Sequence, residues 1–206
     1  KKRYHTDYVV DFRDEWTSNP YQNDVRHPKR IIDKNRKLEH DVVSNCSGIV
    51  YTLPKYMKES FESSYPFLAQ MPWKIIPNGF DESDFTTDET ARGDSEDTFT
   101  LTYIGTFYGR RQPGLLWQAL DNLIKTELID PAKIKIKIIG KNTANFVLGE
   151  YVNDQTLNTI VNLQPNLSYH KALAELMTTS ALLLYVAPGT NSQAEITGKI
   201  FEYLRS

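Results

Sequence analysis

Short runs of hydrophobic residues predict strands in the second half of the chain. Residues 99–104 alternate apolar side chains with threonines, and residues 134–139 alternate isoleucines with lysines. A period of two is typical of a strand, and the lysines indicate that one face of the 134–139 strand meets water in its first half. Residues 181–187 (ALLLYVA) are continuously apolar, which predicts a parallel strand covered on both faces.

Helical spacing separates these strands. Pro113 opens a segment whose apolar residues share one helix face, namely Leu116, Leu120, Leu123 and Ile124. Ser168 stands where it can cap another helix, whose apolar residues are Leu173, Leu176 and Met177. The resulting order of strands and helices is that of a Rossmann-like parallel sheet, so the expected fold class is α/β.

The first half of the chain alternates in a similar way. Strands are expected over residues 8–12, 48–52 and 73–76. Pro28 opens a helical pattern, whose expected inner face consists of Ile31, Leu38, Val42 and Cys46. Another helix is expected from the i, i+4, i+8 spacing of Leu53, Met57 and Phe61. This half is therefore expected to be a second Rossmann-like part.

An acidic stretch divides the two halves. Residues 81–98 contain eight acidic residues and only Arg92 as an opposing charge. They follow Pro77-Asn78-Gly79, which is a strong turn signal. Few of them are apolar, and this composition is typical of a linker at a domain boundary. We therefore expect one domain over residues 1–80, a linker over 81–98 and a second domain over 99–206.

Composition narrows the classes of function. The chain is 40% hydrophobic and 24% charged, with a net charge of −2, which argues against a dedicated nucleic-acid binder. The single cysteine, Cys46, permits no internal disulfide and is expected in the core. It favours a reducing compartment and hence a cytoplasmic location. No run approaches the roughly 20 apolar residues of a membrane span.

The segment Glu195-Ile196-Thr197-Gly198-Lys199-Ile200-Phe201-Glu202 holds the most informative chemistry. It predicts the start of a helix, where unpaired N–H groups favour anions. A lysine there favours a phosphate, and a glutamate one turn further in can accept hydrogen bonds from sugar hydroxyls. The segment therefore suggests a site for a nucleotide sugar. The alternative is an ordinary amphipathic helix with a solvated Glu202, whose apolar residues Ile200, Phe201 and Leu204 pack inward.

Two further loops are expected at the same edge of the sheet. In open α/β sheets, ligands bind outside the carboxyl ends of the strands. Residues 105–111 supply a glycine, which lets a phosphate approach the backbone, and the arginines Arg110 and Arg111. The loop after Gly140 and the stretch 188–199 lie at that edge as well. The G-x-G-x-x-G fingerprint of a dinucleotide site is absent from the first of these loops.

Several motifs resemble GT-B glycosyltransferases of the family 4 ("group 1") type. Besides the 195–204 segment, they are Asn78-Gly79-Phe80-Asp81 with Phe85, Tyr103-Ile104-Gly105-Thr106 and Asp11-Phe12-Arg13-Asp14-Glu15-Trp16. The resemblance implies a GT-B-like fold in which both Rossmann-like parts are incomplete. Residues 1–80 would be the back portion of an acceptor-side domain, and residues 99–206 a truncated donor-binding domain.

The resemblance also implies an activity. The enzyme would be a hexosyl-type, retaining glycosyltransferase that moves a sugar from a UDP- or GDP-linked donor to a glycan or lipid-linked acceptor in polysaccharide biosynthesis. It would need no cofactor and no metal, which agrees with the absence of an Asp-x-Asp motif. Peripheral association with the inner face of the membrane is compatible with such an acceptor. The resemblance implies that the stretch is a fragment of that enzyme, so it need not be active by itself.

The family's roles fall on particular positions here. Those expected to be catalytic are Lys199, Arg111 and Glu195. Donor binding is expected from Gly105, Thr106, Arg110, Arg111, Thr197, Gly198, Lys199 and Glu202. Glu202 matches the second glutamate of the family's E-x7-E motif, whereas the first would fall on Ala194, one residue from Glu195.

Asp11, Arg13 and Asp14 are expected on the acceptor side, with a purely structural charged cluster as the alternative. The mismatch at Ala194 leaves open a second function, a non-catalytic nucleotide-sugar-binding or interaction protein with a degenerate GT-B site.

Overall fold

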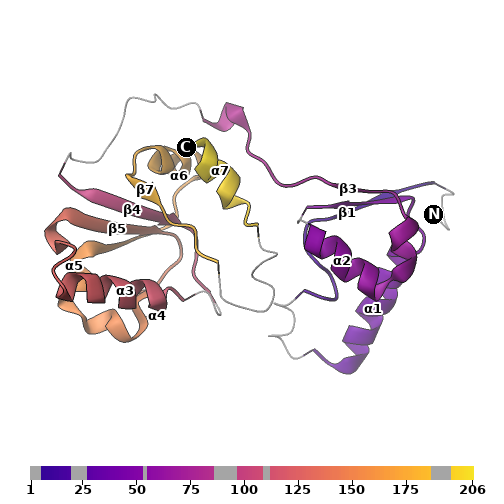
Figure 1. Ribbon diagram of the computed structural model, residues 1–206, viewed down its shortest axis with the longest axis horizontal. Coiled ribbons are helices and arrows are strands. Elements are labelled where there is room, and N and C mark those ends of the chain that lie inside the picture. The colour runs from indigo at the N-terminus through magenta and orange to yellow at the C-terminus, as the bar shows by residue number, and fades with distance from the viewer. Residues whose placement is uncertain (1–5, 20–26, 53–54, 86–96, 109–111, 187–195) are drawn as a thin grey trace. The chain divides into compact units, whose positions relative to one another are not determined.

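The computed structural model describes residues 6–19, 27–52, 55–85, 97–108, 112–186 and 196–206. The chain divides into two compact units (Figure 1). The N-terminal unit comprises Lys1–Asn78 and Thr190–Ile196, and the C-terminal unit comprises Gly79–Gly189 and Thr197–Ser206. The predicted limits of the two domains and the linker stay predictions.

The N-terminal unit is a parallel sheet with helices packed on one face. The strands, in sheet order, are β1 (Val9–Phe12), β2 (Gly48–Tyr51) and β3 (Trp73–Ile75). The helices are α1 (Lys29–Val43), α2 (Lys55–Ser64) and the 3₁₀ helix η2 (Pro66–Gln70). Their core contains Phe12, Val43, Cys46, Ile49, Tyr51, Met57, Phe61 and Leu68. The predictions for Met57, Phe61 and Cys46 are confirmed, while Leu53 lies outside the described residues.

The inner face of α1 differs from the prediction. Ile31 is 37% exposed and Leu38 is 42% exposed, whereas Glu39 and Val43 are buried. The reason is that Glu39 finds donors inside the unit: the backbone N–H of Thr17 and the hydroxyl of Tyr65. Hydrogen bonds offset the cost of burying a carboxylate, so the helix turns a polar position inward.

The C-terminal unit contains a four-stranded parallel sheet. The strands, in sheet order, are β6 (Val161–Gln164), β5 (Ile134–Ile139), β4 (Phe99–Ile104) and β7 (Ala181–Leu182). The helices are α3 (Gly114–Lys125), α4 (Ala144–Leu148), α5 (Gln155–Ile160), α6 (Tyr169–Met177) and α7 (Lys199–Arg205). The described part of the unit also contains the 3₁₀ helices η3 (Glu82–Asp84), η4 (Pro131–Lys133) and η5 (Gly149–Asn153).

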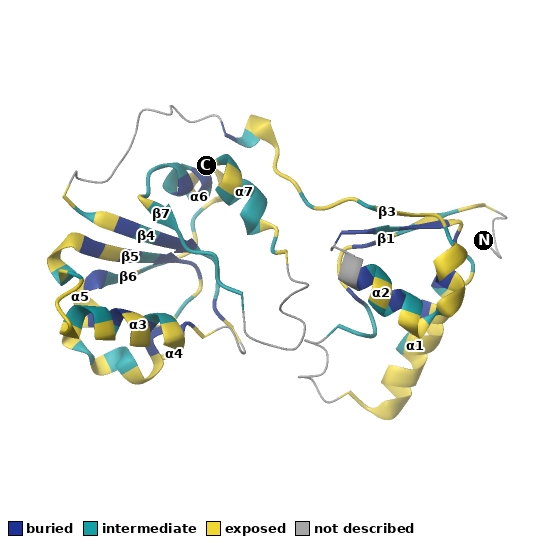
Figure 2. Cartoon of the chain, in the orientation of Figure 1, coloured by how far each residue is buried: buried dark blue, intermediate teal, exposed yellow. Residues whose placement is uncertain are grey.

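Helices cover both faces of this sheet (Figures 1 and 2). On one face, α3, α4 and α5 pack around Trp117, Leu120, Val147, Leu157, Tyr103, Ile136 and Ile138. On the other face, α6 and α7 pack around Leu173, Leu176, Tyr203 and Phe85. Parallel sheets buried in this way are typical of doubly wound α/β folds.

Two local predictions for this unit need correction. Among the described residues 181–186 of the predicted strand, Ala181 and Leu182 pair with β4, and the last bond to β4 runs from the N–H of Leu183 to the carbonyl of Thr102 at 2.8 Å. Residues 183–186 are half-buried. Ser168 does precede α6, but its side chain makes no capping hydrogen bond. The prediction that lysines of β5 meet water is confirmed for Lys135, which is exposed. Lys137 instead lies 2.7 Å from the carboxylate of Glu175.

Candidate functional site

Lys199 is the first residue of α7, and its side chain reaches the carboxyl end of β4. Its Nζ donates a hydrogen bond of 3.1 Å to the hydroxyl of Tyr103 and lies 4.3 Å from the centroid of that ring. Tyr103 is a residue of β4 and is 2% exposed. The hydrogen bond and the cation–π contact together hold the ammonium group in place. A fixed positive charge therefore stands at the sheet edge where α/β proteins bind ligands.

Gly105, directly after β4, leaves room for this ammonium group. Its φ is +149°, and a Cβ atom there would meet Nζ of Lys199. Gly140 follows β5 with a φ of +154°, and a Cβ atom there would meet the carbonyl group of Gly105. Residues with side chains rarely adopt such φ values. The loops after the two strands thus touch backbone to backbone, with Lys199 against the first of them.

The side-chain amide of Asn142 joins these two glycine loops. Its Nδ2 donates to the carbonyl of Gly105 at 2.9 Å, and its Oδ1 accepts from the N–H of Phe107 at 2.9 Å. Its backbone N–H donates to the carbonyl of Gly140 at 2.9 Å. Both functions of the amide are therefore used within the site, and the loop that follows β4 is held in one conformation.

Three aromatic rings pack together at the loop that follows β4. Tyr103 and Phe107 stack with centroids 4.2 Å apart and planes 15° apart, and Tyr185 meets Phe107 edge-on at 5.7 Å. The Tyr185 hydroxyl donates to the carbonyl of Gln112 at 2.6 Å, and desolvation raises the pKa of Tyr185. Offset and edge-to-face packing of rings stabilises such clusters by about 0.5–1.5 kcal/mol per pair beyond area burial. The Lys199 ammonium therefore lies over the ring of Tyr103, which is itself packed against Phe107.

Thr197 and Gly198 directly precede α7. The Oγ1 atom of Thr197 is buried and has no hydrogen-bond partner among the described residues. Leaving a buried hydroxyl unpaired costs about 1–3 kcal/mol, so such a group calls for an explanation, and a ligand atom would supply it. Gly198 is exposed with a helical backbone, and Thr106 is half-buried in the loop after β4.

Glu202 lies one turn beyond Lys199 and is held by a residue of another helix. Tyr169, the first residue of α6, donates its hydroxyl to Oε1 of Glu202 at 3.0 Å, and the same hydroxyl lies 3.1 Å from Oδ2 of Asp84. Desolvation, Glu202 and Asp84 together raise the pKa of Tyr169 to about 12. The phenol therefore keeps its proton at neutral pH. Leu204, which the amphipathic alternative places inside, is 80% exposed.

The remaining donor-site predictions concern the loops. Arg110, Arg111 and Glu195 lie outside the described residues, so their roles stay predictions. Among the described residues, Lys199 and Gly105 come into contact as expected of one sheet edge.

The predicted acceptor-side residues lie in the N-terminal unit, where Asp11, Arg13 and Asp14 are all exposed. The Arg13 guanidinium lies 3.1 Å from the Asp11 carboxylate and donates to Oδ1 of Asn78 at 3.0 Å. These contacts tie the end of β1 to the turn after β3. They agree with the structural alternative, and the acceptor-side role stays a prediction.

Three residues of the site were not predicted from the sequence: Tyr103, Asn142 and Tyr169. Tyr103 reads as an ordinary strand residue, and its contact with Lys199 spans 96 positions. Asn142 could have been suspected, because an amide two residues after a strand-ending glycine is well placed to hydrogen-bond a neighbouring loop. Tyr169 carries no such signal.

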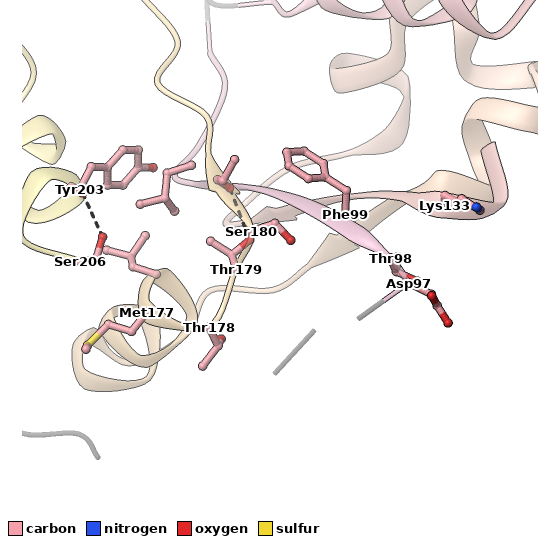
Figure 3. A pocket seen from close by; sticks show the side chains of 13 residues that line it. Asp97, Thr98, Phe99, Lys133, Met177, Thr178, Thr179, Ser180, Tyr203 and Ser206 are labelled. Atoms are coloured by element: carbon pink, nitrogen blue, oxygen red, sulfur yellow. Dashed lines mark hydrogen bonds between the residues drawn. The ribbon is translucent and has the colours of Figure 1, made fainter. Parts of the chain in front are cut away.

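A pocket of the C-terminal unit lies at the opposite edge of the sheet (Figure 3). It is lined by Asp97, Thr98, Phe99, Lys133, Leu176, Met177, Thr178, Thr179, Ser180, Ala181, Leu182, Tyr203 and Ser206. Several of these residues precede or begin strands β4, β5 and β7, so the pocket lies at amino ends. None of the predicted donor-site residues lines it. Because ligands of such sheets bind at carboxyl ends, we do not assign the candidate site to this pocket.

The described residues were also compared with the requirements of a metal site and of a membrane span. Within these ranges, no group of three or more His, Cys, Asp or Glu side chains could hold a metal ion. None of the described helices combines the length and the apolar character needed to cross a bilayer. Metal independence and location stay predictions.

Comparison with known proteins places the fold. The chain is similar in structure to the sucrose-phosphate synthase from Thermosynechococcus elongatus, with a TM-score of 0.61 and 13% sequence identity. The similarity covers 91% of this chain and 47% of that chain, so the chain spans about half the length of that structure. No family model matches the sequence, and no curated protein matches it. The expected α/β, GT-B-like fold with two Rossmann-like parallel sheets is confirmed.

Proposed function

We propose that the chain carries the donor site of a GT-B glycosyltransferase of the family 4 type, which transfers a sugar from a nucleoside diphosphate to a glycan or lipid-linked acceptor. The observation that carries this proposal is the ammonium group of Lys199, held on Tyr103 against Gly105 at the carboxyl end of β4. The likeness to a sucrose-phosphate synthase supports it.

The chemistry of the proposed reaction suits this arrangement. When the bond between sugar and diphosphate breaks, negative charge builds on the leaving diphosphate. A preorganised positive charge lowers the free energy of that transition state without reorganising solvent. Tyr103 and the glycine loop fix the position of the Lys199 ammonium, and Arg110 and Arg111 are proposed as further cations. Because these side chains supply the charge, we propose a metal-independent reaction. Retention at the anomeric carbon is proposed from the resemblance to family 4 alone.

The rest of the donor would lie along the start of α7. The unpaired hydroxyl of Thr197 is proposed to meet a phosphate or sugar oxygen. The Glu202 carboxylate is proposed to accept hydrogen bonds from ribose hydroxyls. Glu195 is proposed to contact the sugar, and Asp11, Arg13 and Asp14 to face the acceptor.

Titration calorimetry with UDP, GDP and ADP on the full chain tests this proposal. At least one nucleotide should bind, and Lys199→Ala should weaken its binding about 10- to 100-fold, the loss expected for a charge-assisted hydrogen bond. Lys133→Ala, which removes an exposed lysine at the amino edge of the same sheet, is the matched control and should bind normally. Failure of all three nucleotides to bind would sink the proposal.

A second assay separates catalysis from binding alone. The nucleotide that binds would be supplied as its glucose or mannose derivative, with glycan and lipid extracts as acceptors. Release of free nucleoside diphosphate with glycosylated product supports the transferase. Binding without any turnover supports the alternative, a nucleotide-sugar-binding protein with a degenerate site.

A further inference from the structure

Residues 79–85, here called the docked segment, contact α6 and α7 of the C-terminal unit through Glu82, Asp84 and Phe85. The Arg205 guanidinium donates to both carboxylate oxygens of Glu82, with Nε–oxygen distances of 2.9 and 2.8 Å. The same guanidinium lies 5.0 Å from the centroid of the Phe85 ring. Phe85 is 9% exposed and packs with Leu173 and Leu176 of α6. One charged contact and one buried ring thus hold the segment in place.

A third contact links the docked segment to the proposed nucleotide site. The Tyr169 hydroxyl lies 3.1 Å from Oδ2 of Asp84 in the segment and 3.0 Å from Oε1 of Glu202 in α7. A phenol has a single proton to donate. Because both acceptors are carboxylates at nearly equal distances, the two contacts compete for that proton, and neither has its full strength.

We infer that Tyr169 couples occupation of the nucleotide site to the docking of residues 79–85. The inference rests on the proposed function, in which ribose hydroxyls donate to Glu202. Once those hydroxyls satisfy Glu202, the proton of Tyr169 is released to Asp84, and the docked segment is held more tightly. Linkage requires the reverse as well, so a docked Asp84 favours nucleotide binding. The phenol remains protonated throughout, as the raised pKa of Tyr169 requires.

A double-mutant cycle measures this coupling. In Asp84→Ala, the Tyr169 proton belongs wholly to Oε1 of Glu202, and a ribose hydroxyl that binds this oxygen must compete with a full-strength hydrogen bond. Binding of UDP, GDP or ADP, whichever binds, should weaken about three- to ten-fold, the factor expected for one hydrogen bond. In the Tyr169→Phe background, the same Asp84→Ala change should leave the affinity unaltered. Equal loss in both backgrounds, or no loss in either, would overturn the inference.

Hydrogen exchange provides an independent readout. The N–H of Asp84 donates to the carbonyl of Asp81 and that of Phe85 to the carbonyl of Glu82, so both report docking. Saturating nucleotide should slow their exchange in the wild-type chain and leave it unchanged in Tyr169→Phe. Arg205→Gln is the matched control: it should speed exchange with and without nucleotide, yet keep the slowing that nucleotide causes.

The two experiments distinguish a failure of the coupling from a failure of the proposed function. If none of the three nucleotides binds the wild-type chain, the proposed function fails and the coupling fails with it. If a nucleotide binds and depends on Lys199, but exchange of the docked segment does not respond, the function stands and the coupling alone is refuted.

Discussion

The charged groups that internal contacts hold in place differ in sign between the two units. In the C-terminal unit, the glycine loops after β4 and β5 leave room for the ammonium of Lys199. In the N-terminal unit, two carboxylates are buried: Glu15, three residues after β1, is 8% exposed, and Glu39 of α1 is 2% exposed. The charge held in place is therefore an ammonium group in the C-terminal unit and carboxylates in the N-terminal unit.

The two solutions also differ in where the partners come from. Glu39 accepts hydrogen bonds from the N–H of Thr17 at 3.0 Å, from the Thr17 hydroxyl and from the Tyr65 hydroxyl at 2.8 Å. These donors belong to the same unit, so the carboxylate works as an internal anchor. The Lys199 ammonium lies on a ring at a sheet edge, which suits the proposed diphosphate. The comparison teaches that a buried carboxylate with several internal donors is explained by packing alone, whereas a lysine held against a glycine loop at the carboxyl end of a strand is a candidate site.

Removing the internal anchor should give the largest effect. Glu39→Leu leaves the N–H of Thr17 and the hydroxyl of Tyr65 without their acceptor, and we expect the free energy of unfolding of the N-terminal unit to fall by about 2–4 kcal/mol. Hydrogen exchange of β2 amides against urea would measure it. Asp33→Leu, at an exposed position of the same helix, is the control and should change little. A similar small change for Glu39→Leu would mean that the carboxylate is not an anchor.

The glycine loop of the C-terminal unit should be the next most sensitive place. Gly140→Ala puts a Cβ atom against the backbone of Gly105 at a φ of +154°, and backbone cannot rotate away as a side chain can. We expect a loss of about 1–3 kcal/mol in the unfolding free energy of that unit, together with weaker nucleotide binding. Gly149→Ala, where φ is +55° and nothing lies within 4 Å, isolates the φ cost alone at about 1–2 kcal/mol. Equal losses would show that the two loops do not rely on close contact.

Glu15 tests whether every buried carboxylate of the N-terminal unit is an anchor. Desolvation raises the pKa of Glu15 above its ordinary value of 4.5, and Glu39 raises it further, although Ser60 and Ser18 lower it. The folded chain therefore binds this proton at pH values where the unfolded chain has lost it. Stability from this group is fully present below pH 4.5 and is lost as the pH rises through the folded pKa.

Replacing Glu15 by Gln should remove this loss of stability with rising pH. Each unit by which the pKa is raised corresponds to about 1.4 kcal/mol, so Glu15→Gln should gain stability relative to wild type as the pH rises from 4.5 to 7. Urea unfolding across this range, followed by exchange of β2 amides, would show it. Parallel pH profiles for the two proteins would mean that Glu15 does not titrate in this window.

Hydrophobic periodicity predicted most of the fold, because burial of a sheet face leaves a direct trace in sequence. The strands around Ile136 and Ile49 follow that rule. The prediction of the inner face of α1 was wrong, because the hydrophobic pattern alone cannot show that Thr17 and Tyr65 donate to Glu39. The strand expected over residues 181–187 was too long, because an apolar run shows burial but not ladder pairing.

The candidate site was predictable only in part. Gly105 and Lys199 could be found because a glycine after a strand and a lysine at a helix start are local signals. Their contact through Tyr103 depends on residues 96 positions apart. The role of Tyr169 likewise depends on Asp84 and Glu202, which are 85 and 33 positions away. Such partners are set by topology, and no local pattern encodes them.

Arg13 offers the smallest expected change in stability and the sharpest test of the N-terminal edge. Its ion pair with Asp11 is exposed on both sides, with side chains 61% and 46% accessible, and exposed pairs contribute about 0–1 kcal/mol. Arg13→Gln should therefore leave the exchange of β2 amides nearly unchanged. If Arg13 serves the proposed acceptor, the same variant should lower sugar transfer at least about ten-fold while nucleotide affinity stays at the wild-type value. Lys29→Gln, at an exposed position of α1, is the control for loss of one positive charge. Unchanged transfer in Arg13→Gln would leave only the structural tie to Asn78, and the opposite charges of the two units would then reflect a site in one unit and packing in the other.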